Sequence, residues 1–205
     1  MTQRKKSAPS SSGGRGPGPG GRLRIIGGRW RGRRLEFPSG TGIRPTPDRV
    51  RETLFNWLQM DIAGSRCLDL YAGSGTLGVE ALSRGAREVV FVDADPRATR
   101  SLEAALREFG AEGGHVARAD VSAFLAGPPE PFDIIFLDPP YRSGVLEPVC
   151  RILDERGWLR PGGLAYLEDS ADAGAPALPP GWTLLRSRRA GEVGYHLARR
   201  EVTDN

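Results

Sequence analysis

A glycine-rich segment between an apolar strand and a helix most constrains what this chain can fold into. Residues 69–78 contain the pattern G-x-G-x-x-G at Gly73, Gly75 and Gly78, and Asp93 ends the next apolar run, twenty residues after Gly73. In doubly wound sheets such glycines let the backbone approach a ligand, and the acidic residue accepts hydrogen bonds from ribose hydroxyls. The spacing therefore predicts a bound nucleoside cofactor rather than a simple strand-to-helix turn.

Strand and helix patterns alternate along the rest of the chain. Apolar runs such as 134–137 (Ile-Ile-Phe-Leu) are typical of parallel strands covered on both faces. Two strand-like segments joined by a turn at Gly191 end the chain. We therefore expect an α/β, Rossmann-like fold whose mostly parallel sheet ends in an antiparallel hairpin. The expected strands cover 66–71, 88–92, 115–118, 132–137, 163–167, 182–188 and 193–198, and the expected helices 76–83, 96–109, 121–125 and 145–156.

Positive charge is concentrated in the first quarter of the chain. Residues 1–51 hold 13 lysines and arginines and two acidic residues, whereas residues 52–205 hold 16 and 23. This asymmetry favours a polyanion-binding segment attached to an acidic domain, and a solubilising tail is the alternative. From composition we expect a disordered basic Ser/Gly/Pro tail over 1–21, a basic hairpin over 22–43 and the main domain over 44–205.

The start of the main domain has a helix-start pattern. Thr46 is predicted as the N-cap, with Pro47 in the first helical position and Asp48 at the positive end of the helix dipole. Arg44, Asp48 and Arg51 can either position part of a cofactor or form ion pairs on the helix face. We favour the first interpretation.

The two cysteines and the apolar runs exclude several classes of protein. Cys67 and Cys150 lie in apolar segments without metal-ligand spacing, so we expect buried free thiols in a reducing cytoplasm and no metal site. No apolar run approaches the roughly 18–20 residues that a membrane span needs. The basic start of the chain lacks the apolar block of a secretory signal.

Two features favour S-adenosylmethionine over a nicotinamide cofactor. Asp69 lies near the end of its strand, where a carboxylate can receive the cofactor's amino group. The second feature is the tetrapeptide 138–141 (Asp-Pro-Pro-Tyr), which directly follows the apolar run 132–137. Ligands bind at the carboxyl ends of strands in an open α/β sheet, so this tetrapeptide is expected to face the cofactor.

The chemistry of amino methylation explains such a tetrapeptide. The nitrogen of a nucleobase amino group is a poor nucleophile because its lone pair is delocalised into the ring. The Asp138 carboxylate and the Pro139 carbonyl can accept its two N–H groups and aim the nitrogen at the methyl group. Pro140 helps to fix the backbone, and Tyr141 offers a ring for stacking a flipped-out base.

Four segments of the sequence together carry a family resemblance. They are Arg24-Ile-Ile-Gly-Gly-Arg-Trp-Arg-Gly-Arg, Arg44-Pro-Thr-Pro-Asp-Arg-Val-Arg-Glu-Thr-Leu-Phe-Asn, Asp69-Leu-Tyr-Ala-Gly-Ser-Gly and Asp138-Pro-Pro-Tyr. With them the chain resembles, from about Arg24 to Leu197, the RsmD family of bacterial methyltransferases, which modify a guanine of small-subunit ribosomal RNA at its exocyclic amine. The first two segments are the more diagnostic, because many S-adenosylmethionine enzymes share the other two.

The resemblance implies a seven-stranded class I methyltransferase in the cytoplasm. Its expected activity is methyl transfer from S-adenosylmethionine to the N2 amine of a guanine in 16S rRNA, within an assembling or complete small ribosomal subunit. The target amine is expected at 138–141. The expected cofactor contacts are Asp69, Tyr71, Gly73, Ser74, Gly75, Asp93, Asp120, Arg44 and Thr46. Asp120 can alternatively be a surface residue at a helix start.

The basic segment supplies the predicted RNA contacts. Arginines neutralise phosphates and aromatic rings stack on bases, so we predict RNA contacts in the stretch 29–34. The residues concerned are Arg29, Trp30, Arg31, Arg33 and Arg34. The alternative for Trp30 is that it packs the hairpin onto the sheet.

Three other functions compete with this interpretation. A DNA adenine-N6 or cytosine-N4 methyltransferase uses the same Pro-Pro-aromatic chemistry, but 205 residues leave no room for a target-recognition domain. A non-catalytic RNA-binding module has no need for the acidic residues at the strand ends. A dehydrogenase has no evident need for the tetrapeptide at 138–141.

Overall fold

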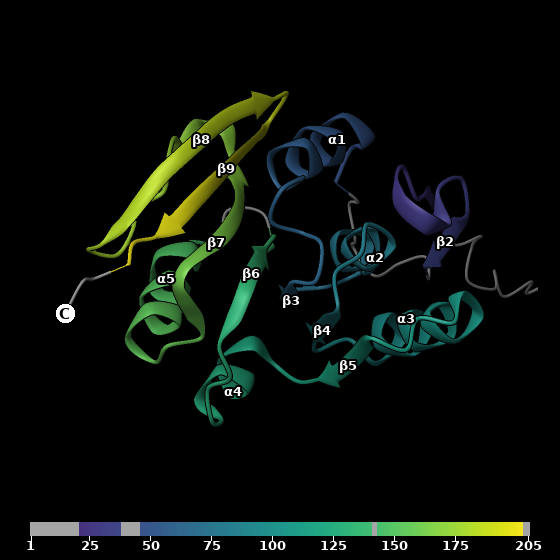
Figure 1. The fold of residues 1–205 in the computed structure, drawn as a ribbon. Helices are drawn as coiled ribbons and strands as arrows, with labels where there is room; N and C mark the ends of the chain where they lie inside the picture. Colours follow the sequence, from purple (N-terminus) through teal and green to yellow (C-terminus); the bar gives the residue numbers. More distant parts are fainter. Residues whose placement is uncertain (1–20, 38–45, 141–142, 203–205) are drawn as a thin grey trace, which may run out of the picture.

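The computed structural model describes residues 21–37, 46–140 and 143–202. Its largest element is a seven-stranded sheet in the order β5-β4-β3-β6-β7-β9-β8 (Figure 1). The first five of these strands run parallel, and β9 pairs antiparallel with both β7 and β8. The expected Rossmann-like fold with an antiparallel hairpin is therefore confirmed. The strands are β3 (Arg66–Leu70), β4 (Glu88–Asp93), β5 (Gly114–Arg118), β6 (Phe132–Leu137), β7 (Leu159–Ser170), β8 (Trp182–Ala190) and β9 (Val193–Arg200).

Helices cover both faces of this sheet (Figure 1). One face carries α1 (Asp48–Trp57), α2 (Thr76–Ser83) and α3 (Pro96–Phe109), and the other carries α4 (Val121–Ala126) and α5 (Leu146–Glu155). Side chains alternate along a strand, so Phe136 of β6 belongs to the core beneath α1–α3 and Leu137 to the core beneath α4 and α5. This double cover explains the apolar strands seen in the sequence. In the described part of the chain, no helix is long and apolar enough to cross a membrane.

The predicted element bounds agree closely with the structure, except for one strand. The bounds of α2, α3 and β6 are as predicted, and most others differ by one or two residues. The exception is β7, predicted over 163–167. It begins at Leu159, which pairs with Phe132 of β6, and it extends to Ser170 because its last three residues pair with β9. Backbone pairing needs no apolar side chain, so the sequence pattern ends before the strand does.

At the start of α1, the structure differs from the prediction that Thr46 is the N-cap. Thr46 does not cap the helix: Pro47 holds the cap position, and no side chain there accepts a hydrogen bond from the first helical amides. The Thr46 hydroxyl donates instead to Asp138 Oδ2 at 3.3 Å. A half-buried carboxylate directly after β6 therefore accepts from the hydroxyl that the local pattern assigned to the helix.

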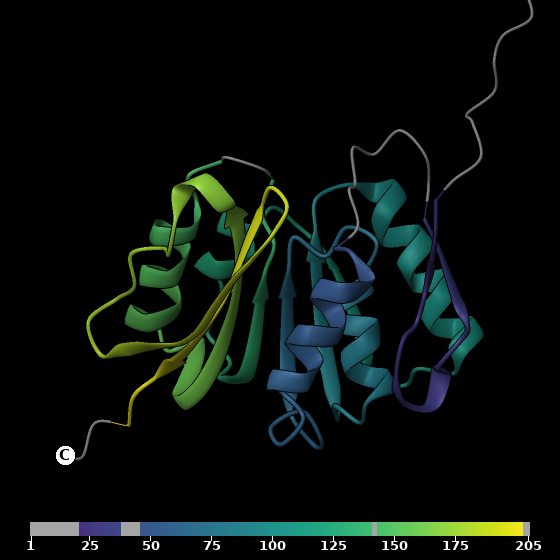
Figure 2. The same cartoon turned by 90° about the horizontal axis from the view of Figure 1, so that it is seen from above.

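The basic N-terminal segment forms a hairpin of β1 (Gly21–Arg24) and β2 (Arg34–Phe37), with a short 3-10 helix, η1 (Gly28–Trp30), between them. Its apolar side chains Ile25 and Leu35 are buried in the core beneath α1–α3. Figure 2 shows the hairpin lying along α3. The hairpin is therefore packed against the main domain.

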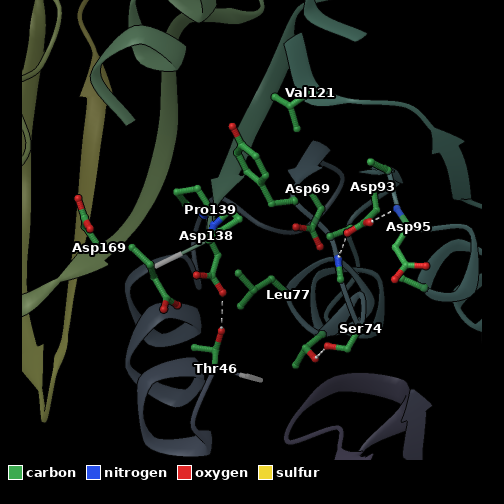
Figure 3. Close-up of a pocket in the computed structure, with 18 of the residues that line it drawn as sticks. Thr46, Asp69, Ser74, Leu77, Asp93, Asp95, Val121, Asp138, Pro139 and Asp169 are labelled. Carbon is green, nitrogen blue, oxygen red and sulfur yellow. Dashed lines mark hydrogen bonds between the residues drawn. The ribbon is translucent and has the colours of Figure 1, made fainter. Parts of the chain in front are cut away.

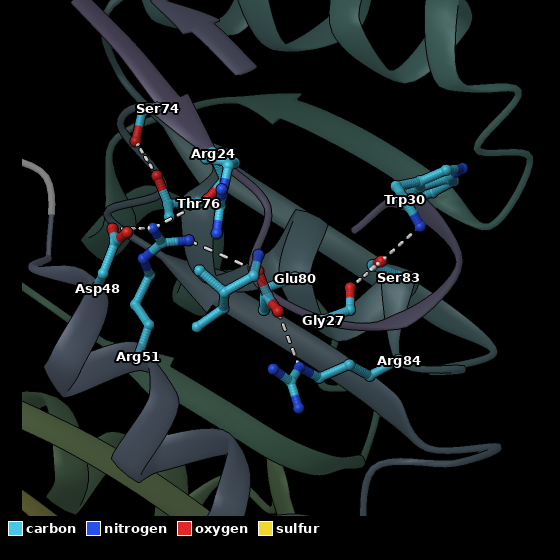
Figure 4. Close-up of polar contacts among 11 residues, drawn as sticks. Arg24, Gly27, Trp30, Asp48, Arg51, Ser74, Thr76, Glu80, Ser83 and Arg84 are labelled. Atoms are coloured by element: carbon cyan, nitrogen blue, oxygen red, sulfur yellow. Dashed lines mark hydrogen bonds and ion pairs between the residues drawn. The ribbon is translucent and has the colours of Figure 1, made fainter. Parts of the chain in front are cut away.

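A buried carboxylate fixes the hairpin to the helices (Figure 4). The Glu80 side chain on α2 is fully buried and accepts the backbone N–H of Ile26 at 2.9 Å. It also pairs with Arg84 at 2.8 Å and with Arg51 of α1 at 3.5 Å. One carboxylate thus connects the hairpin, α1 and α2.

The structure also gives Arg51 a role that differs from the predicted one, which was to position part of a cofactor. Its guanidinium is buried, donates to the Arg24 carbonyl at 3.0 Å and pairs with Asp48 at 2.5 Å (Figure 4). Neither Arg51 nor Asp48 lines the pocket described below, so both form structural ion pairs rather than positioning a cofactor. Arg44 lies outside the described residues.

Both cysteines are buried free thiols, as predicted. Burial raises the pKa of the Cys67 thiol and of the Cys150 thiol to about 12, so both stay protonated at neutral pH.

Candidate active site

A pocket of about 670 Å³ lies at the carboxyl ends of the parallel strands, where α1, α2 and α3 begin (Figure 3). Most of the predicted site residues line it together, although they come from five separate segments. They are Thr46, Asp69, Tyr71, Gly73, Ser74, Asp93, Asp120, Asp138, Pro139 and Pro140. Gly75 belongs to the loop without lining the pocket, and Tyr141 lies outside the described residues.

The glycine loop depends on its glycines for two different reasons. Gly75 has a φ of +73°, a conformation that L side chains rarely adopt. At Gly78 an added Cβ would lie 2.2 Å from the Phe91 ring, so the close contact between α2 and β4 excludes any side chain. Tyr71 also has a positive φ, 64°, which is uncommon for a residue other than glycine and is typical of functional sites.

Two backbone N–H groups of the glycine motif are already bonded to carboxylates. Asp93 accepts the N–H of Gly73 at 2.7 Å, and Asp69 accepts the N–H of Gly78 at 2.9 Å. A dinucleotide fold offers such N–H groups to a pyrophosphate. Here a pyrophosphate would meet carboxylates, which argues against a nicotinamide dinucleotide.

A row of acidic side chains lies at or near the carboxyl ends of four neighbouring strands. Each lies two positions beyond a residue of the core beneath α1–α3, so all four lie on the same face of the sheet. The four are Asp69, Asp93, Asp138 and Glu168. In the described part of the chain, no lysine or arginine forms an ion pair with any of them. The pocket wall therefore favours a positively charged ligand.

Asp69 lies deepest in this row and is 2% exposed. Burial raises the pKa of the Asp69 carboxyl well above its usual range, and the nearby charges of Asp138 and Asp93 raise it further. A cationic group bound beside Asp69 would favour its ionised form.

Asp138 stands where the tetrapeptide begins, with its side chain directed toward Thr46 (Figure 3). Burial raises the pKa of the Asp138 carboxyl to about 6, and the Thr46 hydrogen bond opposes that shift. Asp138 is therefore mostly ionised at neutral pH and offers acceptor oxygens to the pocket.

Glu168 is a pocket residue that the sequence interpretation missed. It is 5% exposed and accepts a hydrogen bond from the Tyr166 hydroxyl at 2.5 Å. Burial, followed by the Asp138 charge, raises the pKa of the Glu168 carboxyl to about 8. Its signal in the sequence is an acidic residue directly after the apolar run 164–167, as Asp138 directly follows the apolar run 132–137.

Ser74 and Asp120 both line the pocket and also make local contacts. The Ser74 hydroxyl lies 2.5 Å from that of Thr76, at the start of α2. Asp120 caps α4 and accepts the N–H of Ser122 at 2.8 Å. The helix-start interpretation of Asp120 is therefore confirmed, and its carboxylate still faces the pocket.

The structure removes Trp30 from the predicted set of RNA contacts. Its ring is 6% exposed and packs against the Phe109 ring at a centroid distance of 5.3 Å, and its backbone N–H donates to Ser83 Oγ. A base cannot stack on a ring that the core already covers. Arg33 also contacts α3, because it lies over the Phe109 ring and pairs with Glu108.

The basic turn of the hairpin lies far from the pocket. Phe109, against which Trp30 packs, is the last residue of α3, whereas Ala98 in the first turn of α3 lines the pocket. A helix of 14 residues is about 20 Å long. RNA bound at the exposed Arg29, Arg31 and Arg34 would therefore extend over about that distance to reach the pocket.

Within the described residues, no three histidine, cysteine, aspartate or glutamate side chains are arranged to hold a metal ion. The pocket is thus characterised by its carboxylates and its glycine loop.

Known proteins resemble this chain over nearly its whole length. The family model described as "Conserved hypothetical protein 95" matches residues 23–199. The chain is 45% identical over 182 residues to ribosomal RNA small subunit methyltransferase D of Escherichia coli (strain K12), covering 89% of this chain and 92% of the relative. The same named protein of Haemophilus influenzae is 42% identical, over 88% of this chain and 95% of its own length.

A solved structure resembles this chain in both sequence and fold. A protein described as a putative methyltransferase from Escherichia coli superimposes with a TM-score of 0.82 at 42% identity, covering 88% of this chain and 99% of that structure. The matches extend over the hairpin, the glycine loop and the acidic strand ends alike. The chain therefore belongs to the RsmD family.

Proposed function

We propose that this protein transfers a methyl group from S-adenosylmethionine to the N2 amine of a guanine in 16S ribosomal RNA. The observation that carries this proposal is the row of acidic side chains around a glycine loop, in which the N–H groups of Gly73 and Gly78 are already bonded to carboxylates. A cofactor with an ammonium and a sulfonium group suits such a wall, whereas a pyrophosphate does not. The names of the relatives, ribosomal RNA small subunit methyltransferase D, support an rRNA substrate.

The pocket residues divide between holding the cofactor and holding the target. Asp93 would accept hydrogen bonds from the ribose hydroxyls, and the buried Asp69 would receive the amino group. Asp120, at the far side of the glycine loop, would accept the adenine amino group. When bound, the cofactor supplies an electrophilic methyl group.

The target amine would be held by the tetrapeptide. The Asp138 carboxylate and the Pro139 carbonyl would accept its two N–H groups, and Thr46 orients Asp138 from the opposite side. These acceptors stabilise the positive charge that develops on nitrogen as the methyl group arrives. The proton is released afterwards from the methylated amine.

The function is tested by methyl transfer from tritiated S-adenosylmethionine to small ribosomal subunits from a strain lacking its own enzyme of this family. We expect label in small-subunit RNA, with little in large-subunit RNA or in double-stranded DNA. Equal labelling of DNA would favour the DNA amino-methyltransferase alternative. Binding of small-subunit RNA without any transfer would favour a non-catalytic RNA-binding module.

Replacing Asp93 by alanine is expected to weaken S-adenosylmethionine binding by about 1.5–3 kcal/mol, the range for a hydrogen bond to a charged group. Because Asp93 also holds the N–H groups of Gly73 and Asp95, part of this loss would come from the loop. An analogue without ribose hydroxyls separates the two contributions: the wild type should lose affinity for it and Asp93→Ala should not. Equal losses in calorimetry for both proteins would reject the ribose contact.

Removing the exposed arginines of the hairpin is expected to raise the apparent KM for RNA and to flatten its salt dependence, since each neutralised phosphate releases counterions. The variant replaces Arg29, Arg31 and Arg34 by alanine and keeps Arg33, which contacts α3. Cofactor affinity should stay unchanged.

Two controls accompany that measurement. Replacing three arginines elsewhere, at positions 118, 151 and 160, removes the same charge from other exposed sites. Deleting residues 1–20, which lie outside the described residues, should have a smaller effect than the hairpin variant. A larger effect of the deletion would assign RNA binding to the tail instead.

A further inference from the structure

Glu168 and Asp138 occupy equivalent positions at the ends of neighbouring strands. β6 and β7 run parallel with Leu137 opposite Leu167, so the two acidic residues follow at the same level. Both line the pocket, and the Thr46 hydroxyl lies within hydrogen-bonding reach of both carboxyl groups. Figure 3 shows Asp138 and Thr46 at this corner of the pocket. Two carboxyl groups therefore share the wall where the target amine would bind.

The surroundings of Glu168 hold its side chain in place. The Tyr166 hydroxyl donates to Glu168 Oε1 at 2.5 Å, and both side chains are buried. Burying a second carboxyl group beside Asp138 disfavours ionisation of the pair and lowers the stability of the fold. A buried, held carboxyl group that faces a pocket is typical of a ligand-binding role, and the methyl-transfer mechanism above does not use it.

The neighbours of the target amine differ between the nucleobases. In guanine the ring atom N1 beside the N2 amine carries a hydrogen and is a donor. The ring nitrogens beside the exocyclic amines of adenine and cytosine carry none and are acceptors. A carboxyl group next to the amine-binding acceptors can accept a hydrogen bond from a ring N–H through its oxygen.

We propose that Glu168 accepts the hydrogen bond of guanine N1–H, beside the N2 amine that Asp138 holds, and thereby selects guanine over other bases with an exocyclic amine. The inference rests on the function proposed above and adds the residue that determines its base specificity. Leaving a buried acceptor unpaired is costly, so a site built for an N–H rejects a base that lacks it.

The test compares two bases that differ at N1. Small-subunit RNA is prepared with either guanine or 2-aminopurine at the position that the wild-type enzyme methylates. 2-Aminopurine keeps the 2-amino group, but its N1 carries no hydrogen. It also lacks the 6-oxygen of guanine, a difference that is the same for wild type and for every Glu168 variant. The assay is run at about pH 8.5, above the pKa of Glu168, so that the side chain is mostly ionised and mainly acts as an acceptor toward that nitrogen.

Wild type should prefer guanine, and Glu168→Ala should lower kcat/KM for guanine by about 10- to 150-fold, the equivalent of one hydrogen bond to a charged group. The kcat/KM of Glu168→Ala for 2-aminopurine should change little. The ratio of kcat/KM for guanine to kcat/KM for 2-aminopurine should therefore fall sharply. Glu168→Gln keeps an acceptor oxygen, so its ratio should lie between those of wild type and Glu168→Ala. The same variant provides the test if Glu168→Ala is unstable.

Glu155→Gln is the control, because it neutralises an exposed carboxylate at the end of α5 that does not line the pocket. This variant should keep the wild-type ratio. A folded Glu168→Ala or Glu168→Gln protein with the wild-type ratio would overturn the assignment of Glu168 alone. A wild-type enzyme that transfers no methyl group to guanine N2 would overturn the proposed function, and this inference with it.

Discussion

Asp138→Ala should transfer methyl groups at least about 10²-fold more slowly than the wild type, judging by the cost of removing one preorganised electrostatic group. The carboxylate orients the amine and stabilises the charge that develops on nitrogen. Both effects act mainly in the transition state, so turnover should fall while binding of cofactor and RNA changes little. Single-turnover kinetics with saturating cofactor measure this step directly.

Asp138→Asn is the matched variant for the same position. It keeps an acceptor oxygen and can still bond to the Thr46 hydroxyl, but it carries no charge. We expect its rate to lie between those of wild type and Asp138→Ala. A correctly folded Asp138→Ala protein with near-normal single-turnover transfer would contradict the role given to Asp138.

The pH dependence of turnover should show the titration of the Asp138 carboxyl group. Burial raises the pKa of the Asp138 carboxyl to about 6, and the ionised form is the one that orients the amine. The single-turnover rate should therefore rise as pH increases through about 6. The neighbouring Glu168 titrates with a pKa of about 8, so the two groups titrate as a pair and the rise is broad. Asp138→Asn should lose the rise near pH 6.

Glu80→Ala should lower the free energy of unfolding by about 3–5 kcal/mol, because the buried Arg51 guanidinium would lose its buried carboxylate partner and keep only Asp48, whose side chain is largely exposed. The N–H of Ile26 would also lose its acceptor. Urea unfolding measures the change. The matched control is Glu147→Ala, which removes an exposed pair with Arg151 and should cost at most about 1 kcal/mol. Similar stabilities of the two variants would show that the buried cluster does not hold the hairpin and helices together.

The fold could be predicted largely from local signals in the sequence. Apolar runs, glycine positions and helix periodicity identified the sheet and both helices that flank β4, since these depend on residues close in the chain. The extension of β7 to Ser170 was missed because it depends on pairing with β9, about 25 residues away along the chain. The Glu80 cluster was missed for the same reason, because its partners come from three separate segments.

The candidate site was predictable where a residue's position in its own strand determines its place. Asp69 lies near the end of its strand, Asp93 and Asp138 end or follow apolar runs, and the sheet brings all three to one edge. Thr46 and Trp30 were misassigned because tertiary contacts decide their roles: one bonds to Asp138 and the other packs on Phe109. Local patterns cannot show which distant side chain completes a hydrogen bond or covers a ring.

The central claim is that this pocket methylates the N2 amine of guanine in small-subunit RNA. The most direct test is to digest the RNA after transfer from labelled S-adenosylmethionine and to identify the labelled nucleoside by chromatography and mass spectrometry. The account predicts N2-methylguanosine as the labelled product, and its loss with Asp138→Ala. Label in N6-methyladenosine or N4-methylcytidine would contradict it.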